Sequence, residues 1–314
     1  GACSDRRRRS MAVRRPRLFG LALYALLVLL TCPSSSGHAG CQNKPPAPSL
    51  ALTTTDAGEG KPQFAPSRRV TKAAPAIIEE LIRRFLKPGV MNLAAGYSHW
   101  DPPEDCVERA QEMLREEKGK KLFQTELNRY GDAMGLPALR DALTAKLKEE
   151  NDIEGREVIV TAGANQAFHN VANAVIDEGD RVVLFKPYYF SHIVALQLAG
   201  ADVVVAPTDL DYQPDLFYLK SIINESEHEG KPVKMVVITT PGNPSGAVIE
   251  RDTIRRLEGM CSAAGAWLVS DETYEYFVYD GAEHVSPNAT DGVINIYSFS
   301  KSYGMAGGRG GDVG

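Results

Sequence analysis

The feature that most constrains this chain is an alternation of short β-branched runs with helical stretches, which begins near residue 157. Runs that are apolar along their whole length are typical of strands buried on both faces of a sheet. Helices between such strands cover those faces, so the pattern predicts an α/β fold with a mostly parallel central sheet and helices on both faces. The strands are expected at Val158–Thr161, Arg181–Phe185, Asp202–Val205, Val233–Thr239, Ala266–Ser270 and Val293–Ser298. The helices between them are expected at Asn165–Ile176, Ile193–Leu198, Asp215–Ser221 and Arg251–Ala264.

Composition agrees with a soluble globular protein. The chain has 314 residues, of which 43% are hydrophobic and 24% charged, and this length is ample for a large buried core. These values exclude a wholly disordered, a collagen-like or a polytopic membrane protein. Residues 1–72 hold 12 Lys and Arg against 3 Asp and Glu, whereas the remainder holds 23 against 37. An acidic globular part argues against nucleic acid as a partner.

Residues 1–40 have the pattern of a targeting segment. Seven arginines precede an apolar run from Leu18 to Leu30, and small residues follow this run. A helical run of this length covers about 20 Å, less than the ~30 Å hydrocarbon core of a bilayer. The pattern favours a signal peptide that directs the protein to the secretory pathway or an organelle, such as a plastid, with an uncleaved membrane anchor as the alternative. Residues 41–69, rich in Pro, Ala, Ser and Thr, are expected to be a disordered linker.

Polar residues follow the expected strands at their carboxyl ends, which is where ligands bind in open α/β sheets. Taken alone, each of these residues or segments also has an ordinary structural interpretation. Asp271 suits a helix cap, the Pro241–Gly246 segment suits a simple turn, and Lys301 suits a solvated surface. Their joint occurrence at successive strand ends favours a binding site. The segments concerned are Thr161–Asn165, Pro187–Phe190, Pro241–Gly246, Asp271–Tyr274 and Ser298–Arg309.

These segments carry the motifs of a known family. Lys301 lies in the motif Ser298-x-Ser-Lys, Arg309 follows it, and Asn243-Pro-x-Gly and Asp271-x-x-Tyr lie upstream. From about Asn92 to Arg309 the sequence resembles the class I/II aminotransferases, which are fold-type I enzymes dependent on pyridoxal 5′-phosphate. The strings PYYFSH, PGNPSG, DETYEYFVYDG and SFSKSYGMAG are most similar to plant-type enzymes that act on aromatic amino acids and methionine.

The resemblance implies a catalytic role for three residues. Lys301 matches the lysine that holds the cofactor as a Schiff base and then moves a proton during amino transfer. Asp271 matches the carboxylate that pairs with the pyridinium nitrogen, which maintains the ring as an electron sink. Tyr274, together with Asn243, matches the hydrogen-bond donors to the phenolic oxygen of the cofactor.

Further cofactor contacts follow from the same resemblance. Tyr189 matches the aromatic residue that stacks on the ring. The cofactor phosphate is a dianion, which the N-terminus of a helix beginning at Ala164 and Asn165 would attract. Ser298 and Arg309 match the other phosphate ligands.

Two residues of the N-terminal region are also implied. Tyr130 matches a tyrosine that reaches the cofactor phosphate of the neighbouring subunit, so a homodimer with shared active sites is expected. Gly96 matches a glycine beside the substrate carboxylate. Residues 70–130 are then expected to belong to the small domain and the dimer arm, and residues 131–314 to form the cofactor-binding large domain.

The sequence departs from the family at its C-terminal end. Gly308 and Gly310 stand where the family has a large aromatic and an apolar residue. The family continues with an antiparallel strand inside the sheet, an inter-domain helix, the small domain and the arginine that binds the substrate carboxylate. The glycine-rich segment 310–314 does not suggest a strand. The expectation is a C-terminally truncated chain that lacks the small C-terminal domain and this internal strand, and therefore folds poorly.

Three functions remain open at this point. The first is an aminotransferase, which moves an amino group between an L-amino acid and a 2-oxo acid. The second is a C–S lyase of the same fold, because the cofactor motifs are shared. The third is an inactive fragment, or a partner subunit, with an intact motif lysine.

The remaining chemistry-bearing residues have structural interpretations. His99, His169 and His192 are expected to pack or to lie at the surface, because the sequence gives them no partner at metal-ligand spacing. No metal site is expected. Cys106 and Cys261 are expected to be small buried thiols.

Overall fold

The structure is a computed structural model that describes residues 66–73, 77–91, 96, 98–115, 121, 129–288, 291–308 and 311–313. The targeting segment 1–40, most of the linker 41–69 and Arg309 lie outside the described residues. The short helix α2 (Arg68–Lys72) spans the boundary expected at residue 70 and contacts α8. No helix among the described residues is long and apolar enough to cross a membrane.

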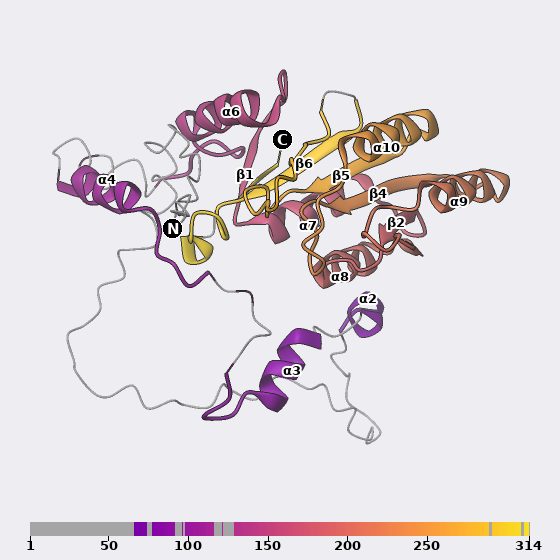
Figure 1. The fold of residues 1–314 in the computed structure, drawn as a ribbon, viewed down its shortest axis with the longest axis horizontal. Helices are drawn as coiled ribbons and strands as arrows, with labels where there is room; N and C mark the ends of the chain where they lie inside the picture. The colour runs from indigo at the N-terminus through magenta and orange to yellow at the C-terminus, as the bar shows by residue number, and fades with distance from the viewer. Residues whose placement is uncertain are drawn as a thin grey trace, which may run out of the picture.

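One seven-stranded sheet forms the centre of the molecule, in the order β1-β7-β6-β5-β4-β2-β3 (Figure 1). The five strands from β6 to β3 pair in parallel, and β7 pairs antiparallel with both β1 and β6. The predicted mostly parallel sheet is thus confirmed. The strands are β1 (Ile159–Thr161), β2 (Arg181–Phe185), β3 (Asp202–Ala206), β4 (Val233–Thr239), β5 (Trp267–Asp271), β6 (Val293–Ser298) and β7 (Gly311–Val313).

Helices cover both faces of the sheet. On one face α7 (Ala164–Val175) and α8 (Phe190–Ala199) pack against alternate residues of the central strands, among them Val182 and Val237. On the other face α9 (Leu216–His228) and α10 (Arg251–Ala264) pack against the residues between them, among them Val183 and Val236. This alternation follows from the two-residue period of a strand, and it buries the strands on both sides.

Another helix extends the second face toward the edge strand. The helix α6 (Pro137–Asn151) packs with Leu139, Leu143 and Leu147 against Val158 and against Tyr297 of β6. The other described elements are α3 (Ile77–Phe85), α4 (Glu104–Arg115) and the short 3₁₀ helix η1 (Ala306–Gly308). The helix α6 was not predicted from the sequence.

The strand β7 corrects a prediction. The internal antiparallel strand was expected to be missing, but Gly311–Val313 occupies this place between β1 and β6. The two flanking strands supply hydrogen-bond partners on both sides, and this tertiary context outweighs the poor strand propensity of the segment. Glycine is also required by space, because a Cβ at Gly311 would lie 2.7 Å from Cα of Gly163.

The two cysteines that the structure describes lie where the sequence places them. Cys106 and Cys261 are free thiols with at most 1% of their surface exposed. Burial raises the pKa of the Cys261 thiol to about 12, with a smaller contribution from the charge of Glu258. Burial, and to a smaller extent the charge of Asp105, also raises the pKa of the Cys106 thiol, so both thiols stay protonated and act as packing groups.

Candidate active site

The carboxyl ends of β4, β5 and β6 bring the predicted site residues to one edge of the sheet. Register places Thr239 of β4 opposite Asp271 of β5, and Asp271 opposite Ile296 of β6. The segments that carry Asn243, Tyr274 and Lys301 all begin at this edge, within a few residues of the paired strand ends. Parallel pairing thus collects polar residues that lie far apart in the sequence.

Asp271 is a buried carboxylate with three hydrogen-bond donors. Its Oδ2 lies 2.9 Å from Nε2 of His192, and its Oδ1 accepts hydrogen bonds from the backbone N–H and the hydroxyl of Thr273 at 3.1 and 2.7 Å. Burial opposes the charge, but the contacts with His192 and Thr273 outweigh it and lower the pKa of Asp271. Asp271 is therefore ionised and available to pair with a cation.

His192 is the functional residue that the sequence interpretation missed. It was expected to pack or to lie at the surface as a structural group, yet only 2% of it is exposed and its ring contacts Asp271. The rings of Phe168 and Tyr189 lie 4.1 and 5.3 Å from the His192 ring, centroid to centroid, and fix its orientation. The available signal was its position in the first turn of the helix that follows the Pro187–Phe190 strand end. His169, in contrast, is exposed, as expected.

Asn243 and Tyr274 lie together beside Asp271. The side-chain amide of Asn243 donates a hydrogen bond to the Tyr274 hydroxyl at 3.2 Å. Burial raises the pKa of Tyr274, and the negative charge of Asp271 and the neighbouring Tyr189 raise it further. We refer to Asn243, Tyr274, Asp271 and Tyr189 as the cluster, in which Asn243 bonds to Tyr274 and His192 contacts both Asp271 and Tyr189. The raised pKa keeps the Tyr274 hydroxyl protonated, so that it can donate a hydrogen bond.

Lys301 lies in the loop that follows β6. Partial burial lowers the pKa of its amine, which raises the fraction of the neutral, nucleophilic form. The amine donates a hydrogen bond to the carbonyl of Gly96 at 2.7 Å, and the hydroxyl of Ser98 donates to the Lys301 carbonyl at 3.1 Å. Gly96, which was predicted to lie beside the substrate, is therefore next to the lysine.

The start of α7 offers an anion site at the same edge. The helix begins at Ala164 after Gly163, whose φ is 106°, and no side chain caps it. Its first backbone N–H groups therefore lack intrahelical partners, and the helix dipole adds positive potential. Asn165 is exposed at this end, and the Gly163 backbone packs against Gly311 of β7.

The remaining predicted contacts have different outcomes. Ser298 is buried at the end of β6, where its hydroxyl accepts a hydrogen bond from the backbone N–H of Ser300 at 3.1 Å. The Tyr130 side chain is fully exposed, so it is not brought into the site of its own subunit. Arg309 lies in the segment that the structure leaves undescribed.

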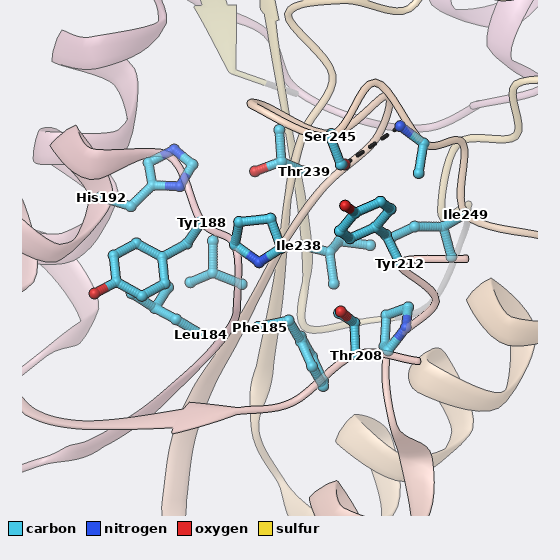
Figure 2. Close-up of a pocket in the computed structure, with 15 residues that line it drawn as sticks. Leu184, Phe185, Tyr188, His192, Thr208, Tyr212, Ile238, Thr239, Ser245 and Ile249 are labelled. Atoms are coloured by element: carbon cyan, nitrogen blue, oxygen red, sulfur yellow. Dashed lines mark hydrogen bonds between the residues drawn. The ribbon is translucent and has the colours of Figure 1, made fainter. Parts of the chain in front are cut away.

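A pocket adjoins the cluster on the side of β2 and β4 (Figure 2). His192 and Tyr188 line one side of it, and Tyr212 and Ile249 line the other. His192 lines this pocket and also contacts Asp271, but none of the predicted site residues lines it. Of the two neighbouring tyrosines, Tyr188 thus lines the pocket, whereas Tyr189 belongs to the cluster.

Comparison with known proteins agrees with this arrangement. The family model for aminotransferases of class I and II matches residues 88–313, which is most of the chain. The chain belongs to the class I and II aminotransferase family. Among curated relatives, the aromatic aminotransferase ISS1 of Arabidopsis thaliana is 41% identical over 237 residues, 74% of this chain and 56% of that protein. A probable aspartate/prephenate aminotransferase of Aquifex aeolicus is 34% identical, over 70% of this chain and 54% of that protein.

Solved structures of aminotransferases share the fold. The aspartate aminotransferase of Thermus thermophilus with maleate is 30% identical, with a TM-score of 0.69, over 80% of this chain and 64% of that one. The aromatic aminotransferase of Pyrococcus horikoshii is 31% identical, with a TM-score of 0.63, over 75% of this chain and 61% of that one. The chain thus has the fold of the fold-type I aminotransferases, and it spans between half and two thirds of the length of these relatives.

Proposed function

We propose that the protein is a pyridoxal 5′-phosphate-dependent aminotransferase that moves an amino group between an L-amino acid and a 2-oxo acid. The observation that carries this proposal is that Asp271 and Lys301 follow neighbouring strands at one sheet edge, with a lowered pKa for each group. A carboxylate that stays ionised in a buried place suits a pyridinium partner. An amine that is easily deprotonated suits a carbonyl partner.

Each polar atom of this cofactor would have a partner among the proposed site residues. Lys301 would hold the aldehyde carbon, and Asp271 would keep the ring nitrogen protonated. Asn243 and Tyr274 would donate hydrogen bonds to the phenolic oxygen, and Tyr189 would stack on the ring. The uncapped start of α7, with Ser298 and Arg309, would hold the phosphate. When bound, the cofactor would supply an electron sink for negative charge at the substrate Cα, and Lys301 would move the proton at that carbon.

The donor substrate class is proposed as aromatic amino acids, with methionine as a further donor. The support is the 41% identity to an aromatic aminotransferase, against 34% to a probable aspartate/prephenate enzyme. Product analysis tests this reaction against the lyase alternative. A new amino acid formed from an aromatic donor and a 2-oxo acid supports amino transfer, whereas ammonia and pyruvate formed from a sulfur amino acid support the lyase.

A homodimer with shared sites is part of the proposal. Tyr130 is fully exposed on its own subunit, which leaves its hydroxyl available to the cofactor phosphate of a partner subunit. We also propose that residues 1–40 direct the protein to the secretory pathway or an organelle. Microscopy of a fluorescent protein fused after residue 69 tests the destination, with residues 1–40 deleted as the control.

The first experiment for this function is an absorbance spectrum of the purified chain with added pyridoxal phosphate. A protein-bound cofactor band that borohydride traps on Lys301 is expected in the parent and not in Lys301→Ala. Lys148→Ala is the control, because Lys148 is an exposed lysine of α6. If the Lys301→Ala chain also yields the trapped adduct, Lys301 does not hold the cofactor. If the folded parent yields none, the proposed function is wrong.

A further inference from the structure

A buried polar network lies on the face of the sheet opposite to that of Asp271. Asp271 and Glu272 are consecutive at the end of β5, so their side chains point to opposite faces. Glu272 is fully buried, and its carboxylate accepts hydrogen bonds from Ser286 and, at 2.7 Å, from Asn295. Nε2 of His284 lies 2.8 Å from the same carboxylate. A buried carboxylate needs such donors, because its desolvation is costly.

A second buried carboxylate belongs to the same turn. Glu275 accepts hydrogen bonds from Lys146 at 2.5 Å and from Asn151 at 3.0 Å, and both partners lie on α6. Lys146 occupies the apolar face of α6 beside Leu143 and Leu147, where an aliphatic residue would pack more simply. A buried ion pair contributes little net stability compared with apolar residues of similar volume. The presence of this ion pair on the apolar face of α6 therefore favours a role in fixing the position of the turn that carries Glu275.

Ser286 joins the two carboxylates. Its hydroxyl donates to Glu272 and accepts a hydrogen bond from Asn151 at 3.0 Å, so Glu272 and Glu275 are connected through two side chains. Ser286 also accepts a hydrogen bond from Tyr297 of β6 at 3.2 Å.

Tyr276 extends these contacts toward Lys301. Its hydroxyl bonds to Glu150 of α6 and lies 3.4 Å from the hydroxyl of Tyr303, two residues after Lys301. The helix α6 thus contacts the turn that carries Tyr274, and Tyr276 of this turn links the helix to the loop that carries Lys301.

We propose that the network of Lys146, Asn151, Glu272, Glu275 and Ser286 positions Asp271 and Tyr274 relative to Lys301, and thereby sets the affinity for the cofactor. This inference rests on the proposed function. Strand pairing holds Asp271, and the N–H of Glu272 still bonds to the Ile296 carbonyl, but the chain leaves the sheet after this point. Contacts from α6 to Glu275 and Tyr276 then help to hold the turn that carries Tyr274 beside the Lys301 loop. Cofactor binding depends on such support, because a displacement of about 1 Å at a site costs affinity and rate. These residues are positioning residues and do not touch the cofactor.

A matched pair of variants separates positioning from general stability. Ser286→Ala removes the hydroxyl that joins the network. Ser226→Ala removes an equally buried hydroxyl of α9, which accepts a hydrogen bond from Arg181 at the amino end of β2. Both variants remove one buried hydroxyl that bonds to a charged group. Tyr276→Phe is a second test, because it removes the contact with Glu150 and Tyr303 and retains the ring.

Three quantities are measured for each variant and the parent. They are the melting temperature, the dissociation constant of pyridoxal phosphate, and the pH midpoint of the visible band of the bound cofactor. Both serine variants are expected to melt a few degrees lower than the parent. Ser286→Ala is expected to weaken cofactor binding by about 10-fold, by analogy with the loss of outer-shell partners at metal sites. Its pH midpoint is expected to rise, because a displaced Tyr274 donates less well to the phenolic oxygen. Tyr276→Phe should change both quantities in the same direction.

Ser226→Ala is expected to leave the dissociation constant within about twofold and the midpoint unchanged. Equal dissociation constants and midpoints for Ser286→Ala, Tyr276→Phe and the control would overturn the inference and leave the proposed function standing. If the folded parent binds no cofactor, the proposed function fails, and the inference fails with it.

Discussion

At the scale of residues, the charge of Asp271 depends on its hydrogen-bond donors. Burial alone would raise its pKa, but contacts with His192 and Thr273 lower it below the ordinary value. A carboxylate with a folded pKa below its unfolded pKa stabilises the protein at pH values above the unfolded pKa. This stabilisation is lost as the pH falls through the folded pKa.

Asp271→Asn should therefore reduce the acid sensitivity of the fold. Urea unfolding of the parent is expected to show a free energy of unfolding that falls as the pH decreases below about 4, the ordinary pKa of aspartate. The variant is expected to lose less over the same range. Asp211→Asn, at an exposed carboxylate, is the control and should behave as the parent does. Identical curves for the parent and Asp271→Asn would contradict this account.

His192→Phe tests the contact that the sequence interpretation missed. The new ring can still pack on Phe168 and Tyr189, but Asp271 loses a buried donor, so the free energy of unfolding should fall by about 1–3 kcal/mol. His169→Phe, at an exposed site of α7, should change it by less than about 0.5 kcal/mol. In the double variant with Asp271→Asn, the His192 change should cost less than it does alone. Strict additivity would mean that the contact contributes nothing.

At the scale of elements, β7 depends on close packing of two backbones. Gly311→Ala would place a Cβ 2.7 Å from Cα of Gly163, just before the start of α7. The strand or the helix must then shift, so thermal unfolding should show a loss of about 1–3 kcal/mol. Gly259→Ala in α10 is the matched control, because open space surrounds its Cβ position and alanine favours the helix by about 1 kcal/mol. A Gly311→Ala chain as stable as the parent would show that the two backbones do not meet.

The parallel strands could be predicted from local sequence patterns. The helix α6, the strand β7 and the contact of His192 with Asp271 were not predicted. The bounds of β2, β4 and β6 agree with the sequence prediction at both ends, because long apolar runs fix buried strands. The Leu139, Leu143 and Leu147 spacing and Pro137 in the first turn are signals for α6 that were overlooked. The glycines of β7 do not indicate a strand, because β7 forms through pairing with β1 and β6, which are distant in the sequence.

The candidate site was predictable where its residues carry motifs. Lys301, Asp271, Asn243 and Tyr274 occur in short, specific strings, and parallel pairing brings these strings to one edge. The contact of His192 with Asp271 and the network behind Glu272 depend on which face each side chain takes. The face to which each side chain points depends on how the helices pack against the sheet, and this packing cannot be deduced from a single sequence.

At the scale of the whole molecule, shared active sites can be tested by mixing inactive subunits. Lys301→Ala removes the lysine, and Tyr130→Ala removes the exposed tyrosine proposed to serve the partner. In a mixed dimer, one site combines the intact Lys301 of one subunit with the intact Tyr130 of the other. Mixing and refolding the two inactive variants should therefore restore aminotransferase activity, measured against each variant refolded alone. No gain on mixing would mean that Tyr130 serves its own subunit or none.

The pairing of β1 through β7 has a consequence for the order of events during translation. Thr161 of β1 bonds to Gly311, 150 residues later in the chain, and β7 is the neighbour through which β1 joins the sheet. On the ribosome, β2 to β6 can pair as they emerge, whereas β1 can join the sheet only after residues 311–313 have been synthesised. Of the strands β1 to β6, β1 is therefore the last to join the sheet, although it is the first to be synthesised.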